Sequence, residues 1–222
     1  MQHISFNSKG LHTFDLSRIK SNCLDHCAIK SVCYQNQNIQ DKLNPGYHKK
    51  MASNWRLING KKSKFLKVMK NSIYRNNLSR IRWFSNGDLY FGDIQKSTKQ
   101  LDNIISLVKI MPDNRFWLVT RNYDTLFNYF EILGNKKPGN INIMLSIDFN
   151  FQPFVKNFCL KYKIQMAYIV EKKKDSNCKS SINGKSCIDN SCTLCFNYTE
   201  DPRRFKIHGS KNDVRFKKLM KK

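Results

Sequence analysis

The stretch "RFWLVTRNYDTLFNYFEILGNKKPGNINIMLSID", residues 115–148, contains one full copy of the pattern that decides the fold. Residues 115–120 are apolar, aromatic and β-branched, which predicts a buried strand. Residues 123–133 place apolar side chains three and four positions apart, which predicts a helix that ends at Gly134. A second apolar run, residues 140–148, predicts another buried strand. A strand, a helix and a strand in this order predict parallel strands joined by a crossover.

The same alternation continues on both sides of that stretch. Further strands are predicted at residues 11–16, 80–85, 164–170 and 203–209, and further helices at residues 46–59, 62–77, 96–111 and 151–162. About six strands with helices between them predict an α/β fold. The prediction is a partial (β/α)6 barrel with mainly parallel strands, and an open doubly wound sheet is the alternative. The middle strands are apolar at nearly every position, which predicts apolar side chains on both of their faces.

The length of 222 residues suffices for one large domain or two small ones. We expect residues 1–170 to form the partial barrel, with a three-cysteine loop near the N-terminus. Residues 171–222 would then form a cysteine-rich metal-binding segment, the last strand and a basic tail.

The composition is strongly basic, with 40 Lys and Arg against 16 Asp and Glu and a net charge of +24. A nucleic acid is the predicted partner, because cations that neutralise phosphates release counterions on binding. Codon bias toward Lys would explain many lysines, but it does not explain the shortage of acids. Aromatic residues beside cations, such as Trp55 with Arg56, suit base stacking in a single strand, although such aromatics more often belong to the core.

The sequence also predicts a compartment. No run approaches about 18 apolar residues, so no membrane-spanning helix is expected. The beginning, "MQHISFNSKG", lacks the charged and then apolar pattern of a secretory signal. We therefore expect a cytoplasmic protein of a bacterial or phage-infected cell. In that reducing interior, clustered cysteines hold metal more often than they form disulfides.

Polar residues follow the predicted strands at the edge where parallel strands place their chemistry. They are Ser85, Gly87, Asp88, Thr120, Arg121, Asn122, Ser146, Asp148, His208 and Gly209. Each alone is an ordinary turn former, but several clusters at one edge predict a site. The sequence shows no Ser–His–Asp arrangement, phosphate-binding glycine loop or H-E-x-x-H helix, so hydrolase and nucleotide-triphosphate chemistry lack support.

The first cysteine group, Cys23, Cys27 and Cys33, has the spacing C-x3-C-x5-C directly after the first predicted strand. Three thiolates on one loop can bind a soft metal and leave one coordination position open. An iron–sulfur cluster with one iron free for a small molecule is one interpretation. Zinc with a fourth ligand such as His26 or His48 is the plainer one.

The second group comprises Cys178, Cys187, Cys192 and Cys195, with the spacing C-x8-C-x4-C-x2-C. The surrounding segment is rich in Ser, Asn and Gly and has little core of its own, which predicts a metal at its centre. A structural zinc bound by four sulfurs is the simplest expectation, and a second iron–sulfur cluster is the alternative. Cys159 stands alone in a predicted helix and reads as a core residue.

Ordered short motifs resemble a known family. They are "NSKG" (7–10), "CY" (33–34), "ASNWRL" (52–57), "RIRWFSNGDLY" (80–90), "FWLVTRN" (116–122), "MLSID" (144–148), the late cysteines and "FKIHG" (205–209). Their order over nearly the whole chain is similar to the phage and plasmid family known as gene product 88.

That family in turn resembles the radical S-adenosylmethionine enzymes. The resemblance implies a six-stranded partial barrel in which Cys23, Cys27 and Cys33 hold a [4Fe–4S] cluster. It further implies that Gly87 and Asp88 lie near the methionyl amino group of S-adenosylmethionine. Four later residues would contact cofactor or substrate: Thr120, Arg121, Ser146 and Asp148. The usual loop is C-x3-C-x2-C, and here Lys30 stands where its third cysteine would be.

Two functions of different classes follow. The first is a radical S-adenosylmethionine-like iron–sulfur enzyme that acts on or near nucleic acid. The second is a zinc-stabilised nucleic-acid-binding protein without catalytic activity. The metal bound by the cysteines distinguishes them.

Overall fold

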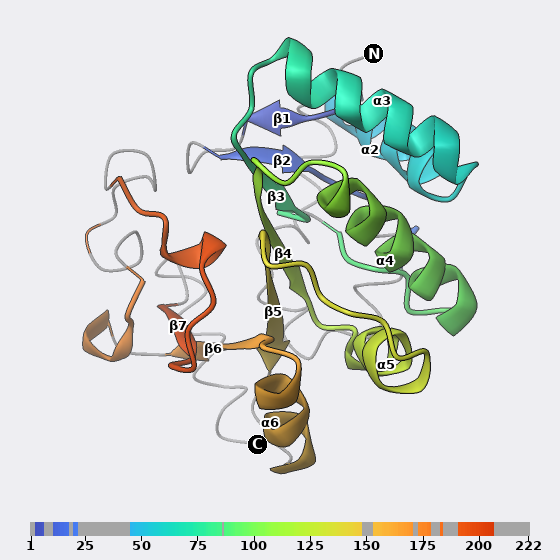
Figure 1. Ribbon diagram of the computed structural model, residues 1–222. Helices are drawn as coiled ribbons and strands as arrows, with labels where there is room; N and C mark the ends of the chain where they lie inside the picture. Colours follow the sequence, from blue (N-terminus) through green and yellow to red (C-terminus); the bar gives the residue numbers. More distant parts are fainter. Residues whose placement is uncertain are drawn as a thin grey trace.

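The computed structural model describes residues 3–6, 11–17, 20–21, 45–85, 87–147, 153–170, 173–178, 183 and 191–206. This part of the chain forms a mixed α/β structure around one sheet (Figure 1). The predicted α/β class is therefore confirmed. None of the described helices is long and apolar enough to cross a membrane.

The sheet of the described residues has seven strands, and their order in space follows their order in the chain. The strands are β1 (Ser5–Phe6), β2 (His12–Phe14), β3 (Arg80–Trp83), β4 (Arg115–Thr120), β5 (Ile141–Ile147), β6 (Gln165–Val170) and β7 (Arg203–Lys206). Only β1 is antiparallel to its neighbour, and β2 to β7 are all parallel. A doubly wound sheet would instead show a point where the strand order reverses.

The helices all contribute to one hydrophobic core and lie on one side of the sheet (Figure 1). They are α2 (Pro45–Ile58), α3 (Lys62–Arg75), α4 (Ile94–Lys109), α5 (Tyr123–Phe127) and α6 (Pro153–Lys161). A π-helical turn, η2 (Asn128–Ile132), continues α5, and short 3-10 turns form η3 (Lys173–Asp175) and η4 (Leu194–Phe196). Side-chain caps fix two of the starts, because Asp93 accepts hydrogen bonds at α4 and Asn122 at α5.

The predicted elements lie within a few residues of the observed ones. The exceptions have physical reasons. β1 has only two residues and therefore shows no periodic pattern. The helix predicted over residues 123–133 is observed, but its second half widens into the π-helical turn before Gly134, whose φ is +63°.

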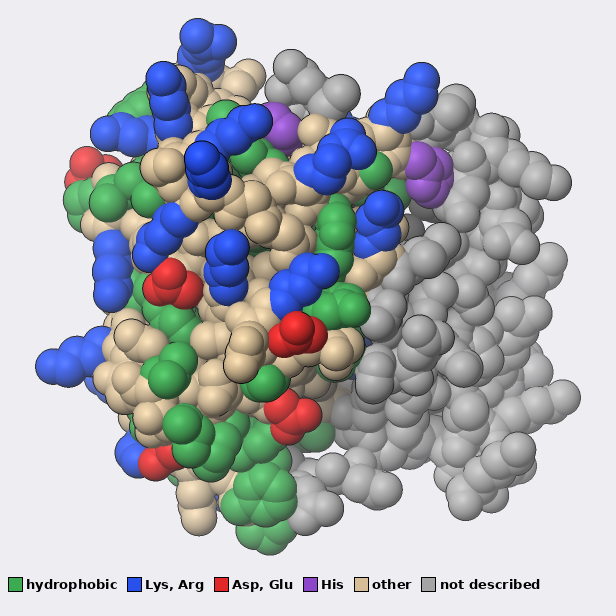
Figure 2. Space-filling model, turned by 90° about the vertical axis from the view of Figure 1, so that its right-hand side faces the viewer, with side chains coloured by type: hydrophobic (Ala, Val, Ile, Leu, Met, Phe, Trp, Pro, Cys, Tyr) green, Lys and Arg blue, Asp and Glu red, His purple; other side chains and the backbone are tan. Residues whose placement is uncertain are grey.

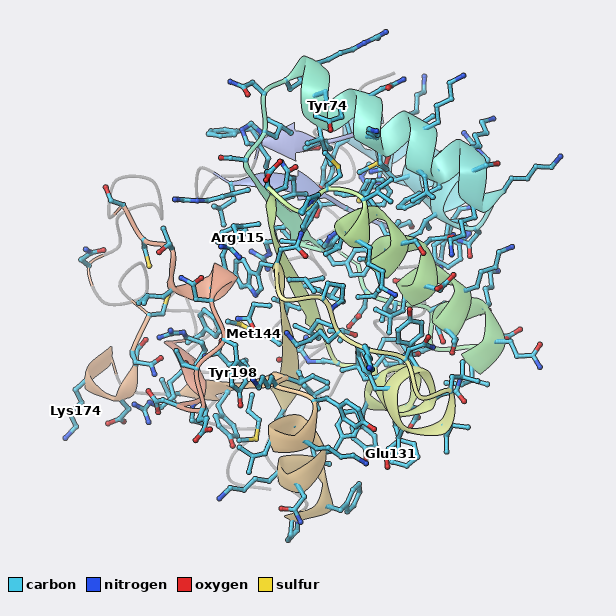
Figure 3. The ribbon with its side chains drawn as sticks, viewed as in Figure 1. Tyr74, Arg115, Glu131, Met144, Lys174 and Tyr198 are labelled. Carbon is cyan, nitrogen blue, oxygen red and sulfur yellow. The ribbon has the colours of Figure 1, made fainter. Side chains whose placement is uncertain are left out.

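The two faces of the sheet differ, although both had been expected to be apolar. The helix-covered face buries large side chains such as Trp83, Phe116 and Ile143 in the main core. The opposite face buries a smaller cluster around Trp117 and Met144, together with the amide of Asn142. Met144 is labelled in Figure 3. The apolar pattern thus predicted the strands, but it did not predict the buried polar residues within them.

Candidate functional site

The candidate site is the edge where β2, β3 and β4 end. These strands are parallel neighbours, with Phe14 paired to Trp83 and Trp83 paired to Leu118. The segments that follow them therefore meet at one edge of the sheet. They are residues 15–17, residues 84–85 and 87–93, and residues 121–122.

Asp15 is the buried centre of this edge. Its Oδ1 accepts hydrogen bonds from the backbone N–H of Ser85 at 2.8 Å and from the Ser85 hydroxyl at 2.9 Å. Its Oδ2 accepts from the Thr13 hydroxyl at 2.9 Å and from the Tyr47 hydroxyl at 2.8 Å. One carboxylate thus joins β2, the loop after β3 and α2. Helix α2 adds a further tie, since Asn54 Nδ2 donates to the Asp15 carbonyl at 2.9 Å.

Gly87 packs directly against the chain after β2. Its φ is +77°, a conformation that L residues rarely adopt. A Cβ at this position would lie 2.5 Å from the carbonyl oxygen of Leu16, so only glycine fits. Leu16 stands shortly before the segment that carries Cys23, Cys27 and Cys33. The glycine–acid loop is therefore in contact with the chain just after β2, seven residues before Cys23.

Asp88 joins the same loop to the end of β4. Its carboxylate accepts hydrogen bonds from the Leu89 N–H at 2.7 Å, from the Arg121 N–H at 2.9 Å and from the Thr120 hydroxyl. Burial raises the pKa of Asp88 to about 6, and these hydrogen bonds partly oppose the rise. The three donors belong to the protein itself, so Asp88 fixes the loop on β4.

Asn122 closes the connection between β4 and the loop. Its backbone N–H donates to the Thr120 hydroxyl at 3.0 Å, and its side-chain Nδ2 donates to the Tyr90 carbonyl at 2.8 Å. Its Oδ1 accepts from the Thr125 N–H at 3.0 Å at the start of α5. A single side chain therefore sets both the loop and the first turn of the helix.

Tyr90 and Trp55 form an aromatic pair beside the loop, with ring centroids 5.5 Å apart. Lys96 Nζ lies 4.6 Å from the Tyr90 ring centroid and 5.2 Å from that of Trp55. The Tyr90 N–H also donates to Gln100 Oε1 at 2.9 Å. The loop after β3 is thus held by α2 and α4 as well as by β4.

A family profile described as "Gene product 88" matches residues 12–218. The chain belongs to the gene product 88 family. No curated protein and no solved structure matches it. The matched range begins at the first residue of β2 and runs past β7, so the family covers all of the parallel strands and the candidate site.

In this gene product 88 protein, five of the predicted site residues lie at the carboxyl edge. Asp88 contacts Thr120 and the Arg121 backbone directly, and Gly87 is its neighbour in the chain. Ser146 follows Leu145, the partner of Thr120 in the sheet, and therefore lies at the same edge. Asp148 lies outside the described residues. Contacts of these residues with a cofactor remain a prediction.

Most of the predicted metal ligands also lie outside the described residues: Cys23, Cys27, Cys33, Cys187 and the alternative ligand His26. Of the others, His48 lies in α2, and its ring centroid is 6.4 Å from that of Tyr47. Cys178, Cys192 and Cys195 are half-buried, and no disulfide joins them. Among the described side chains, no three His, Cys, Asp or Glu residues are grouped as metal ligands. Both metal centres therefore stay predictions.

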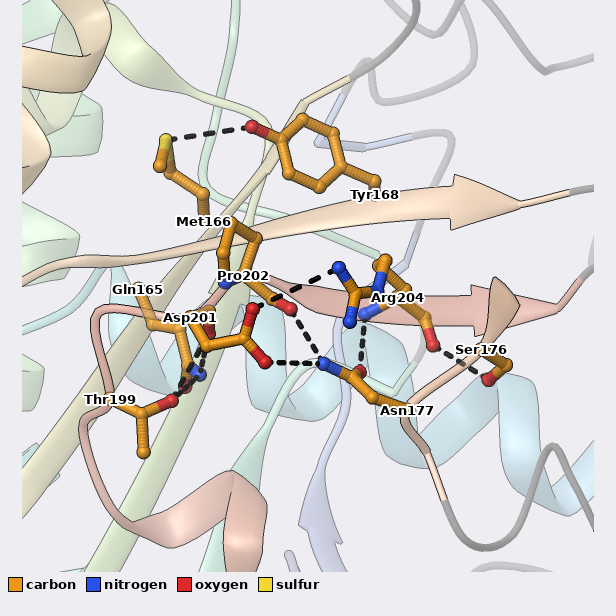
Figure 4. A network of polar contacts seen from close by, with 9 residues as sticks. All are labelled: Gln165, Met166, Tyr168, Ser176, Asn177, Thr199, Asp201, Pro202 and Arg204. Atoms are coloured by element: carbon orange, nitrogen blue, oxygen red, sulfur yellow. Dashed lines mark hydrogen bonds and ion pairs between the residues drawn. The ribbon is translucent and has the colours of Figure 1, made fainter. Parts of the chain in front are cut away.

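The segment with the last two cysteines is docked on the sheet face opposite the helices. Asn142 Nδ2 donates to the carbonyls of Cys195 at 3.1 Å and Asn197 at 3.2 Å. Gln165 Nε2 donates to the Thr199 hydroxyl at 2.6 Å and to a further backbone carbonyl (Figure 4). Phe196 packs edge-on against a tryptophan of β4, with centroids 6.0 Å apart.

Sequence reasoning did not single out Asp15, Tyr47, Asn142 or Gln165. The available signal was a polar side chain inside or directly after an otherwise apolar strand, as in "LHTFDL" and "NINIMLSID". A buried polar group needs hydrogen-bond partners, so such a residue indicates a second segment packed against the strand.

Proposed function

We propose that this protein is an iron–sulfur enzyme of the radical S-adenosylmethionine type, with its active site at the carboxyl edge, acting on or near nucleic acid. The observation that carries the proposal is the contact of Gly87 with Leu16. It brings the glycine–acid loop against Leu16, seven residues before Cys23, and such an enzyme needs its glycine–acid loop and its cysteine loop side by side.

The barrel is part of the same proposal. Six parallel strands follow one another in chain order, and the helices lie on one side of them. Both features are those of a (β/α) barrel in which each helix crosses to the next strand on the outside. We propose that β2 to β7 form a partial (β/α)6 barrel whose inner face is the one that carries Asn142 and Gln165.

Cys23, Cys27 and Cys33 would hold the cluster. When bound, a reduced cluster supplies the electron that cleaves the sulfonium of S-adenosylmethionine, and a redox partner restores that electron. The described residues support this chemistry by holding the backbone of the glycine–acid loop in place. There is no room for a side chain at position 87, and the carboxylates of Asp15 and Asp88 accept backbone hydrogen bonds that fix the loop before and after Gly87. We assign these two acids to positioning, while Arg121 and Ser146 remain candidates for contact with the cofactor.

The late cysteines would hold a structural zinc or a second cluster. Cys192 and Cys195 lie on the segment that Asn142 and Gln165 tie to the sheet. A metal there would fix the end of a segment that has few apolar contacts of its own. Such chemistry requires reduced thiols, so we place the protein in the cytoplasm of a bacterial or phage-infected cell.

One observation favours the second function, a zinc-stabilised nucleic-acid-binding protein. Residues 45–77, which include α2 and α3, carry nine Lys and Arg and no Asp or Glu. That surface would bind a polyanion whether or not the carboxyl edge is catalytic.

Anaerobic purification with quantification of iron and zinc tests the proposal. We expect brown protein with about one cluster at the first cysteine group and a visible spectrum that changes when S-adenosylmethionine is added. Gly87→Ala should keep its iron but lose that change, because the new methyl group displaces the loop from Leu16.

Gly134→Ala is the matched control. Its φ of +63° brings similar backbone strain, but its Cβ would meet no atom within 4 Å. A colourless protein that contains zinc, or a spectrum that does not change when S-adenosylmethionine is added, would rule out the enzyme proposal in favour of the zinc-stabilised nucleic-acid-binding protein.

A further inference from the structure

The outer side of α3 is a continuous basic surface. Its apolar positions, Phe65, Met69 and Ile73, recur every four residues and are buried against the sheet. Six of the exposed residues on and just before this helix form what we call the α3 basic surface: Lys61, Lys64, Lys67, Lys70, Tyr74 and Arg75. From residue 64 to residue 75 the surface extends about 17 Å along the helix. Viewed from the helix side, Lys and Arg outnumber acids over the upper part of this face (Figure 2).

Tyr74 is the unusual member of this surface. Its side chain is 63% exposed, although large aromatic side chains normally bury most of their area. Lys70 Nζ lies 5.6 Å from its ring centroid, one helical turn away. An exposed ring between cations is suited to stack on a nucleobase while the cations contact the neighbouring phosphates. Stacking on a side chain requires an unpaired base, which a duplex does not offer.

One acid beside this region already has a partner. Lys62, at the start of α3, pairs with Asp102 of α4 at 2.7 Å. Residues 45–77 contain no acid to offset the other cations. The surface therefore has the charge complementary to a phosphate backbone. A nucleobase also offers a flat face on which the Tyr74 ring can stack, and an anionic lipid headgroup does not, so we argue for a nucleic acid.

Helix α2 links this surface to the candidate site. It precedes α3 directly in the chain, and its Tyr47 and Asn54 both contact Asp15. A polymer held on α3 would consequently lie beside the helix that supports the carboxyl edge.

We propose that the α3 basic surface binds single-stranded nucleic acid, with Tyr74 as the stacking residue and Lys64, Lys67 and Lys70 as phosphate contacts. The proposal deepens the proposed function, on which its role in presenting a substrate rests. The binding itself requires no metal.

The test compares two triple variants that change the net charge equally. Lys64→Ala, Lys67→Ala and Lys70→Ala are combined in one protein, and Lys136→Ala, Lys156→Ala and Lys174→Ala in the other. The control lysines are also exposed, and Lys174 lies on the far side of the molecule from Tyr74 (Figure 3). Fluorescence anisotropy with a labelled oligothymidylate measures affinity as a function of salt.

The α3 variant should lose at least about tenfold in affinity, and its slope of log affinity against log salt should fall by about two, because each phosphate contact on a single strand contributes about 0.7 to that slope. The control should stay within about twofold of wild type, because only general charge has been removed. Equal losses in the two variants, or wild-type binding by the α3 variant, would overturn the proposal.

Tyr74 gives a second, independent readout. Tyr74→Ala should weaken binding of the single strand by about fivefold to a hundredfold, whereas Tyr74→Phe should retain it. Duplex of the same length should be bound equally by all three proteins. An equal loss for duplex and single strand would remove the stacking role.

Wild-type protein provides the measurement that does not depend on variant folding. Bound oligonucleotide should protect Lys64, Lys67 and Lys70 from acetylation while leaving Lys136, Lys156 and Lys174 reactive, and the reverse pattern would refute the assignment. Vesicles of anionic lipid serve as competitor, and protection by vesicles alone would assign the surface to a membrane. Metal content and the cofactor-dependent spectrum are measured on the same samples, so failure of the enzyme proposal and failure of this one are separately visible.

Discussion

On its helix-covered face the sheet presents Trp83, Phe116 and Ile143, while the same three strands present Arg82, Trp117 and Asn142 on the opposite face. The first face is closed by the five described helices, and the side chains that it buries are mostly apolar. The second is closed by a short segment through amide hydrogen bonds and a few apolar contacts. Burial of apolar area supplies most of the stability of the fold, and most of that area lies on the helix-covered face. The opposite face therefore contributes less to stability, and its polar groups mainly position the segment that covers it. The comparison predicts different costs for matched changes on the two faces.

The largest expected effect is that of Trp83→Ala. Trp83 is fully buried among the rings of Phe14, Phe65 and Phe116, so we expect a loss of about 4 kcal/mol in the free energy of unfolding. Trp117→Ala, on the opposite face, should cost roughly half as much, because its cluster is small and can collapse. Denaturant unfolding of both variants measures the difference. Equal losses would show that the two faces contribute alike.

The next effect is a pH dependence of the free energy of unfolding, caused by Asp88 at the carboxyl edge of the sheet. The pKa of Asp88 is about 6 in the folded protein and 3.8 when unperturbed, so the folded state binds the proton more tightly. Stability due to this group is therefore present below about pH 4 and is lost as the pH rises through 6, by at most about 3 kcal/mol. Unfolding of wild type and Asp88→Asn across this range should show a flatter profile for the variant. Asp113→Asn is the control for the loss of one exposed negative charge. If the wild-type and Asp88→Asn profiles run parallel, Asp88 is not the source of the pH dependence.

A smaller effect is expected for Asn142→Ala. The change leaves the carbonyls of Cys195 and Asn197 without their amide donor, which should cost about 2 kcal/mol. Hydrogen exchange should rise in residues 191–201 and stay unchanged in α3. Asn140→Ala is the control, since Asn140 also donates to three carbonyls, among them that of Val108, away from that segment. Unchanged exchange in residues 191–201 would mean that the amide does not hold the segment.

The smallest effect concerns the outside of the helix layer. Lys62 and Asp102 form an ion pair at 2.7 Å with side chains 45% and 41% exposed. Lys62→Ala should change the free energy of unfolding by no more than about 0.5 kcal/mol, because solvent and salt screen such pairs. A loss above about 1.5 kcal/mol in denaturant unfolding would contradict the view that this exposed ion pair contributes little to stability.

Periodicity was sufficient to predict the six parallel strands and the five helices of the described residues, because apolar spacing records which side of an element is buried, but it missed the two-residue β1. It also located Gly87 and Asp88 at the carboxyl edge. Why a glycine and an acid are needed there could not be predicted, because it depends on how three strands are aligned. Gly87 is required by the close approach of Leu16, and Asp88 accepts a hydrogen bond from the N–H of Arg121, and both partners come from distant parts of the chain. Asp15 was missed because a lone acid after a strand resembles a turn residue.

The unbroken strand order has a consequence for how the chain folds. Phe116 pairs with Ile141 and Met144 with Gln165, so β4, β5 and β6 form over short loops. His12 pairs with Ile81, and this pairing must close a far longer loop. Because the entropy of loop closure grows with loop length, the middle of the sheet is expected to assemble first and the edge formed by β2 and β3 last. The candidate site would then be completed only in the final step of folding.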